Sequence, residues 1–223
     1  MNRLYSYTIP IDDGAAPNPF WGVCTLAICK PAIRRTAKVG DWVVGLGSVD
    51  APSGNLSGKI VYAMRVDFKK TMEEYDELTK TELKKKVPNV DSENLIDRLG
   101  DSIYDFEGSS PKLRKSVHDD GNIKTDLGGK SVLLSKHFYY FGHNAIDLDD
   151  RFEKIIHQQS GHKSNANQDN FEEFVEWIDG LELKVGQLYG WPDFPIEWTE
   201  NSCSSSCAIR KEDNENDEII SAC

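Results

Sequence analysis

The stretch that decides the fold is residues 30–48, KPAIRRTAKVGDWVVGLGS, where a short basic helix pattern runs into a strand pattern that contains glycines. Pro31 suits the first turn of a helix over about 31–38, and Gly40 suits its C-terminal cap. The apolar run over 41–48 predicts a buried strand in which Gly45 and Gly47 share one side. Two interpretations are open: a pocket for a phosphate or nucleobase, or a solvated helix face beside an ordinary core strand.

The segments on either side add further strand and helix patterns to this unit. Residues 3–10 alternate apolar and polar positions, as in a strand, and residues 21–29 form a buried strand or extended segment. Residues 58–67 form a second strand pattern, joined to 41–48 by a polar loop, so the two predict a long hairpin. Thr71 and Glu74 have the spacing of a capping box, which predicts a helix start.

The second half of the chain alternates loop-rich and regular stretches. Residues 80–129 are charged and predict long loops with one short helix around 92–98. Residues 130–142 predict a strand pair or one bent strand, and helices are expected at about 149–158 and 169–180. The order lacks a regular βαβ rhythm and favours the α+β class. One domain over 1–199 is expected, followed by an acidic, disordered tail over 200–223.

Composition excludes several classes of protein. The net charge of -11 opposes non-specific binding to duplex nucleic acid, although a local cationic pocket is still compatible with it. No apolar run is long enough to span a membrane and no secretory signal is seen, so a soluble, cytoplasmic protein is expected. Cys24 and Cys29 lie in an apolar stretch and are expected to be small buried hydrophobes.

The basic helix and the glycine strand each have a functional and a structural interpretation. Lys30, Arg34 and Lys38 share one helix face, so Arg34 or Arg35 could grip a phosphate, or the face could simply be solvated. Gly45 and Gly47 could leave room for a planar ligand beside Ser48, or they could mark a β-bulge.

An aromatic strand supplies the other candidate groups. In SKHFYYFGHNAIDL, residues 135–148, Tyr140 lies on one strand face, and His143 and Asn144 follow Gly142. Stacking combined with amide hydrogen bonds is the chemistry of base recognition, whereas the alternative is an aromatic core strand with a polar turn. No metal site or cofactor is expected from the histidine and cysteine spacing. No Ser or Cys nucleophile is expected, because none is recognised in a strand–turn–helix elbow.

Three segments carry a family resemblance: residues 4–48, then GKIVYAMRV at 58–66, and HFYYFGHNAIDL at 137–148. Together they resemble the nucleotide modification associated domain 2 family of bacteria and phages, over most of residues 3–195. The resemblance implies association with systems that make or handle modified bases in DNA. The KVGDWVVGLGS step is also similar to PUA-like domains, including ASCH and EVE domains, and that similarity implies a small β-barrel with flanking helices around a base-binding cavity.

The leading hypothesis is therefore a binding protein for a modified nucleobase or nucleotide, acting as reader or accessory of a DNA-modification or anti-phage system. Its candidate ligand-binding residues are Tyr5, Tyr7, Trp21, Trp42 and Tyr140 for stacking, Asn18, Ser48, His143 and Asn144 as polar readers, Arg34 and Arg35 for phosphate, and Gly45 and Gly47 as the cavity floor. One alternative is an enzyme of the same pathway in which His137 or His143 is the general acid/base and Asp41 orients it. The other is a non-catalytic protein that docks on a partner protein.

Overall fold

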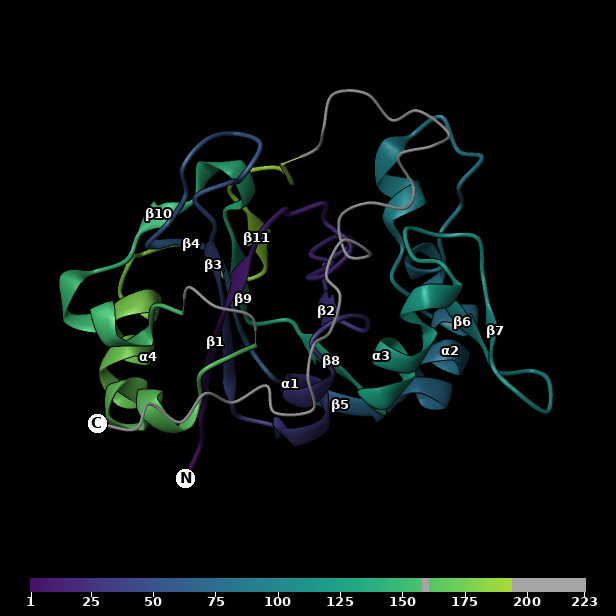
Figure 1. Ribbon diagram of the computed structural model, residues 1–223, viewed down its shortest axis with the longest axis horizontal. Coiled ribbons are helices and arrows are strands. Elements are labelled where there is room, and N and C mark those ends of the chain that lie inside the picture. The colour runs from purple at the N-terminus through teal and green to yellow at the C-terminus, as the bar shows by residue number, and fades with distance from the viewer. Residues whose placement is uncertain (158–160, 194–223) are drawn as a thin grey trace.

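The computed structural model describes residues 1–157 and 161–193 and has mixed strands and helices, which confirms the α+β class (Figure 1). The strands are β1 (Leu4–Ile9), β2 (Cys24–Leu26), β3 (Trp42–Gly47), β4 (Lys59–Arg65), β5 (Phe68–Thr71), β6 (Tyr104–Asp105), β7 (Lys112–Leu113), β8 (Ser131–Ser135), β9 (Phe138–Tyr140), β10 (Ile146–Asp147) and β11 (Gln187–Leu188). The α-helices are α1 (Pro31–Thr36), α2 (Met72–Thr81), α3 (Ile123–Gly128) and α4 (Phe171–Asp179). Short 3-10 segments are η1 (Lys84–Lys86), η2 (Leu95–Leu99), η3 (Asp120–Asn122), η4 (Gly142–Asn144), η5 (Asp150–Ile155) and η6 (Asn165–Asn170).

The larger sheet is an open path of strands, in the order β1-β3-β4-β9-β11, with β10 added beside β4. The predicted hairpin of β3 and β4 is confirmed as an antiparallel pair, whereas β1 runs parallel to β3. No pairing among the described strands joins β1 to β11. The expected closed barrel is therefore not found in the part of the chain that the structure describes.

A smaller antiparallel sheet, in the order β2-β8-β5, lies beside the larger one, and α1, α2 and α3 gather around it (Figure 1). The capping box at the start of α2 is confirmed, because Thr71 Oγ1 accepts the Glu74 N–H and the Glu74 carboxylate accepts the Thr71 N–H. Residues 130–142 do form two strands, but β8 enters the smaller sheet and β9 the larger. This segment therefore connects the two sheets.

Helices and loops differ from expectation mainly in length and type. The segments expected as helices around 92–98 and 149–158 are the 3-10 segments η2 and η5, and α1 ends at Thr36. The loop-rich stretch 80–129 also contains β6, β7 and α3. None of the described helices has the length and apolar character to cross a membrane. The tail over 200–223, with Cys203, Cys207 and Cys223, lies outside the described residues.

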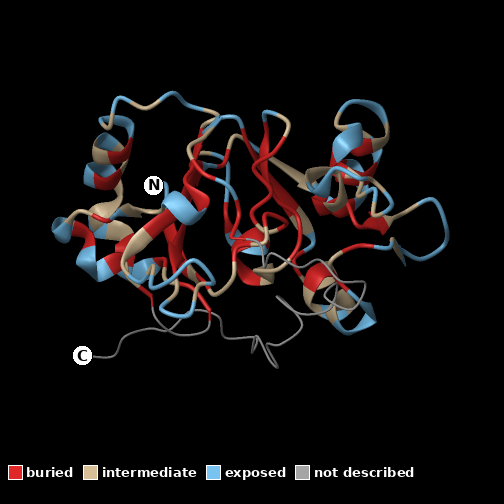
Figure 2. Cartoon of the chain, turned by 90° about the horizontal axis from the view of Figure 1, so that it is seen from above, coloured by how far each residue is buried: buried red, intermediate tan, exposed pale blue. Residues whose placement is uncertain are grey.

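The strands of the larger sheet consist mainly of buried residues, coloured red in Figure 2, and their side chains form a core cluster on each face. One cluster includes Tyr7, Tyr62 and Tyr140 and extends to β2 and α1, while the opposite face packs against α4 through Phe174 and Ile178. A third cluster lies between the smaller sheet and α2. Residues 27–30, the turn between β2 and α1, therefore adjoin the cores of both sheets.

Candidate functional site

The two arginines of α1 have different environments. Arg34 is fully buried, and its guanidinium donates hydrogen bonds to backbone carbonyls, including Cys29 O at 2.7 Å and Ala27 O at 2.7 Å. The expectation that Arg34 lies on a solvated face and grips a phosphate is therefore wrong. Arg35 is exposed and donates one hydrogen bond to Gly128 O at 3.0 Å, so its phosphate role stays a prediction.

The glycines of β3 do not leave room for a ligand, because neighbouring protein atoms occupy the space. A Cβ at Gly45 would lie 2.4 Å from both Ile9 Cδ1 and a ring carbon of Tyr62, and a Cβ at Gly47 would lie 2.4 Å from Leu56 Cβ. The β3–β4 register also shifts after Gly45, as in a β-bulge. Of the two interpretations, the structural one is correct.

The expected stacking residues belong mostly to the core. The side chains of Tyr5, Tyr7, Trp42 and Tyr140 are at most 2% exposed, so their ring faces are covered by protein. Trp21 differs from these four, because it is only half-buried and its φ is 60°. Stacking on Trp21 stays a prediction.

Of the expected polar readers, Asn18 is part of the buried hydrogen-bond network of the core, whereas Ser48, His143 and Asn144 are near the surface. Asn18 is fully buried, donates to Gly14 O and Leu99 O, and accepts a hydrogen bond from the buried Lys86 ammonium at 2.5 Å. Ser48 is half-buried, and Ser48 Oγ accepts the Asp50 N–H.

The two groups after Gly142 are tied to the segment that follows β11. The exposed His143 contacts Trp191 O through Nδ1 at 2.9 Å, and Asn144 donates to Tyr189 O at 2.9 Å. Ser48, His143 and Asn144 keep their ligand-binding role only as a prediction.

The expected His–Asp41 pair does not form. Both carboxylate oxygens of Asp41 accept backbone N–H groups, from Arg3 and Lys38, and this holds the start of β3 in place. His137 instead contacts Asp179 at the end of α4, with 2.8 Å between Nε2 and Oδ1. Asp41 therefore cannot orient His137 as the alternative hypothesis required.

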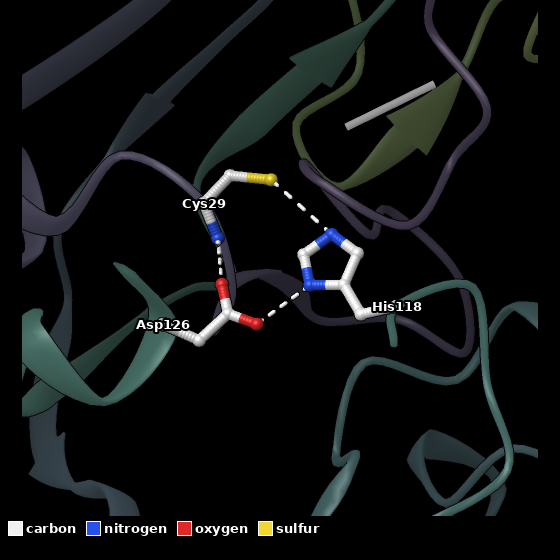
Figure 3. Close-up of side chains that lie close together, drawn as sticks. All are labelled: Cys29, His118 and Asp126. Atoms are coloured by element: carbon white, nitrogen blue, oxygen red, sulfur yellow. Dashed lines mark hydrogen bonds and ion pairs between the residues drawn. The ribbon is translucent and has the colours of Figure 1, made fainter. Parts of the chain in front are cut away.

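A different group of side chains has the geometry of a nucleophile and its base (Figure 3). His118 lies between Cys29 and Asp126, with 3.6 Å between Cys29 Sγ and Nε2 and 2.6 Å between Nδ1 and Asp126 Oδ2. His118 and Asp126 are buried, whereas Cys29 is half-buried. A thiol, an imidazole and a carboxylate in this order are the components of a Cys-His-Asp triad.

The local backbone explains how Cys29 reaches this position. Cys29 and Lys30 have φ values of 55° and 38°, an uncommon conformation for two consecutive residues with side chains, and they turn the chain from β2 into α1. Asp126 Oδ1 accepts the Cys29 N–H at 2.9 Å, so the carboxylate holds the Cys29 backbone as well as the imidazole. Cys29 thus lies in a strand–turn–helix segment, although no cysteine was expected in one. It is also half-buried, although a small buried hydrophobe was expected.

Charge within the triad favours a protonated imidazole. Burial by itself would lower the pKa of His118, but the hydrogen bonds to Asp126 and Cys29 outweigh it and raise that pKa to about 10. Tyr104 donates its hydroxyl to Asp126 Oδ2 at 2.9 Å, and burial followed by the Asp126 charge raises the pKa of Tyr104. Imidazolium beside a thiol favours the thiolate, which is the reactive form of cysteine.

The three side chains also satisfy a distance test for a metal site, since one ligand atom from each lies within 4.8 Å of the others. However, both Asp126 oxygens already accept hydrogen bonds, from Cys29 N–H on one side and from His118 and Tyr104 on the other. The histidine also uses both ring nitrogens within the group. A linear hydrogen-bonded relay accounts for this arrangement better than a metal cage does.

A row of buried hydroxyl groups lies beside the triad on the larger sheet. Tyr7, Gly45, Tyr62 and Tyr140 are register partners across β1, β3, β4 and β9. Because Gly45 has no side chain, the Tyr7 and Tyr62 hydroxyl oxygens meet at 3.0 Å. Tyr140 donates to Asp12 Oδ2 at 2.5 Å.

This row is electrostatically linked to the triad and contains an unusual carboxyl group. Burial raises the pKa of Tyr7, and nearby negative charge at Cys29 and Asp12 raises it further. Burial also raises the pKa of Asp12 to about 7, against the hydrogen bond from Tyr140, which lowers it.

Sequence reasoning missed all three triad residues for identifiable reasons. A cysteine followed by Lys-Pro at a helix start was a usable signal, because Pro31 marks the first helical turn. His118 and Asp126 lie in the loop-rich stretch over 80–129, where no periodic pattern showed which side chains converge.

Comparison with known proteins gives the family. No curated protein and no solved structure matches the chain. A family model, nucleotide modification associated domain 2, matches residues 1–202. The match covers most of the chain, including Cys29, His118 and Asp126, and it supports a role in nucleotide-modification systems. The chain therefore belongs to the nucleotide modification associated domain 2 family.

Proposed function

We propose that this protein is a thiol-dependent enzyme of a nucleotide-modification system, in which Cys29 forms a covalent bond with an electrophilic acyl carbon of the substrate. The observation that carries the proposal is the Cys29–His118–Asp126 relay, with contacts of 3.6 Å and 2.6 Å through one imidazole. Cys29 is half-buried, which is compatible with access of a substrate from the surface, while the other two members are buried.

Each residue of the relay has one task in this reaction. The thiol proton already resides on the imidazolium of His118, so Cys29 Sγ attacks the acyl carbon as the thiolate and forms a C–S bond. The leaving group departs with the electrons of its bond to that carbon and receives the proton from His118. Water then attacks the thioester and gives a proton to His118, and the C–S bond breaks with its electrons on sulfur, which restores the Cys29 thiolate beside the imidazolium. Asp126 keeps the imidazole oriented and stabilises its positive charge.

A second candidate function is binding of a modified nucleobase without turnover. The observation that favours it is a group of aromatic rings near the surface, in which Trp21 is half-buried and Trp191 is 52% exposed. Phe20 packs against both rings, with centroid distances of 5.6 Å to Trp21 and 6.5 Å to Trp191. Such rings suit stacking on a base. A reader would bind its nucleoside stoichiometrically and leave it unchanged, also when Cys29 is replaced by Ala.

The enzyme proposal is tested by the pH dependence of Cys29 alkylation with iodoacetamide, followed by mass spectrometry of the peptide. An activated thiol reacts near pH 6 at a rate close to its maximum, whereas an ordinary thiol has a pKa of about 8.5. His118→Asn should return Cys29 to the ordinary profile, and the fully buried Cys24 is an internal comparison in the same sample. A wild-type Cys29 that reacts like an ordinary thiol would contradict the proposal.

Turnover is tested in cells. DNA and nucleotide pools from cells that express the wild-type protein are digested and compared by mass spectrometry with those from cells that express Cys29→Ser. A nucleoside or acyl group that changes only with the wild-type protein identifies the substrate. Identical profiles, together with stoichiometric retention of a modified base by both proteins, would favour the reader instead.

A further inference from the structure

The buried guanidinium of Arg34 connects the backbone segments that hold the triad. Its Nε donates to Cys29 O at 2.7 Å, and Nη1 donates to Ala27 O at 2.7 Å and to Ser131 O at 3.1 Å. Its Nη2 donates to Asp126 O at 2.5 Å. One side chain from α1 therefore links the turn before α1, helix α3 and the start of β8.

The surroundings of Arg34 are shaped to accept a planar guanidinium. Gly129 lies directly against it, because a Cβ at this position would be 2.3 Å from Arg34 Cζ and 2.4 Å from Nη2. Lysine carries one nitrogen with three donors at the end of a flexible chain, so it cannot reproduce hydrogen bonds to carbonyls that lie in three directions around a fork. Met72 Sδ, 3.4 Å from Nη1, completes the enclosure.

The charge of Arg34 also acts on the triad. Burial lowers the pKa of Arg34, and the negative charges of Asp126 and Cys29 oppose this effect. By reciprocity, a guanidinium that stays charged favours the Asp126 carboxylate and a Cys29 thiolate. The titratable side chains that interact with Cys29 or Arg34 through charge or hydrogen bonds include Tyr7, Asp101, Tyr104, His118 and Asp126, and the Lys30 ammonium lies over the Tyr7 ring.

We propose that Arg34 is a positioning residue for the Cys29 nucleophile: its buried fork fixes the Cys29 turn to α3 and favours the thiolate. This inference rests on the proposed function. Arg34 touches no reacting atom, and it acts through the backbone carbonyls of Cys29 and Asp126 and through its charge. Helix α1 is therefore part of the catalytic framework from its buried face, and not through a solvated cationic face.

The test uses the full chain and the iodoacetamide profile of Cys29 in three variants. Arg34→Lys keeps the charge and loses the fork, and Gly129→Ala keeps Arg34 and displaces the guanidinium. Arg65→Lys is the matched control, because this exposed arginine of β4 pairs with Asp67 away from the triad. Folding of each variant is checked by circular dichroism and thermal melting, and alkylation is measured well below the melting temperature.

We expect the alkylation rate of Cys29 near pH 6 to fall about tenfold in Arg34→Lys and in Gly129→Ala, because the thiol profile moves toward an ordinary pKa of about 8.5. Arg65→Lys should keep the wild-type profile. Unchanged profiles in folded Arg34→Lys and Gly129→Ala would overturn the inference while leaving the enzyme proposal intact. If neither variant folds, Arg34 is a general core residue and the inference is also overturned. An ordinary thiol profile in the wild-type protein would instead defeat the proposed function itself.

Discussion

Replacing Asp12 by Asn should change how the stability of this protein depends on pH. Asp12 is buried, with a pKa raised from the ordinary 3.8 to about 7, mainly because burial penalises its charge. The folded protein therefore keeps a proton on Asp12 between about pH 4 and pH 7, where the unfolded chain has released it. Stability linked to Asp12 is fully present below about pH 4 and is lost as the pH rises through about 7.

The size of the effect follows from the two pKa values. Each pKa unit of difference corresponds to about 1.4 kcal/mol. A rise from pH 5 to pH 8 includes about two pH units in which Asp12 is protonated in the folded protein and ionised in the unfolded chain. Asn has nearly the same shape, does not ionise, and can still accept the Tyr140 hydroxyl. We therefore expect the stability of Asp12→Asn, relative to wild type, to increase by about 2–3 kcal/mol between pH 5 and pH 8.

Urea denaturation of both proteins at pH 5, 6, 7 and 8 measures this difference. The contributions of all other titrating groups to the pH dependence are the same in both proteins and cancel. Tyr140→Phe is a second variant, in which the pH-dependent loss of stability should become larger instead of disappearing. It removes the hydrogen bond that favours the Asp12 carboxylate, so the loss of stability should extend to higher pH. A difference between Asp12→Asn and wild type that stays constant from pH 5 to pH 8 would refute the reasoning, because Asp12 would then ionise as an exposed carboxyl does.

Three further substitutions test the packing, each by urea denaturation at pH 7. Gly45→Ala should cost about 1–3 kcal/mol, because its Cβ would overlap the Tyr62 ring; wild-type stability would contradict the close contact. Lys86→Met should cost about 3 kcal/mol, since it leaves the buried Val23 O and Asn18 Oδ1 without the Lys86 ammonium as donor, and a neutral effect would show that this cluster is not stabilising. Thr71→Ala should cost about 1 kcal/mol through loss of the capping box with Glu74, and no change would mean that the cap is replaced by water.

Local patterns in the sequence predicted those parts of the fold that depend on neighbouring residues. Alternation over 3–10 gave β1, the two apolar runs on either side of a polar loop gave the β3–β4 hairpin, and the capping-box spacing gave α2. The helix expected at about 169–180 is α4, and Phe174 and Ile178 on it are fully buried. These features need only periodicity and short-range hydrogen bonds, which a single sequence contains.

Contacts between distant segments decided the candidate site, and the sequence could not show them. Arg34 has the spacing of a solvated face, yet carbonyls from three separate segments surround it. Gly45 is explained only once Tyr62 packs over it. Cys29 is 89 residues from His118 in the chain and 3.6 Å from it in space. Helical or strand spacing says which side of its own element a residue occupies, but only the packed structure says what lies against that side.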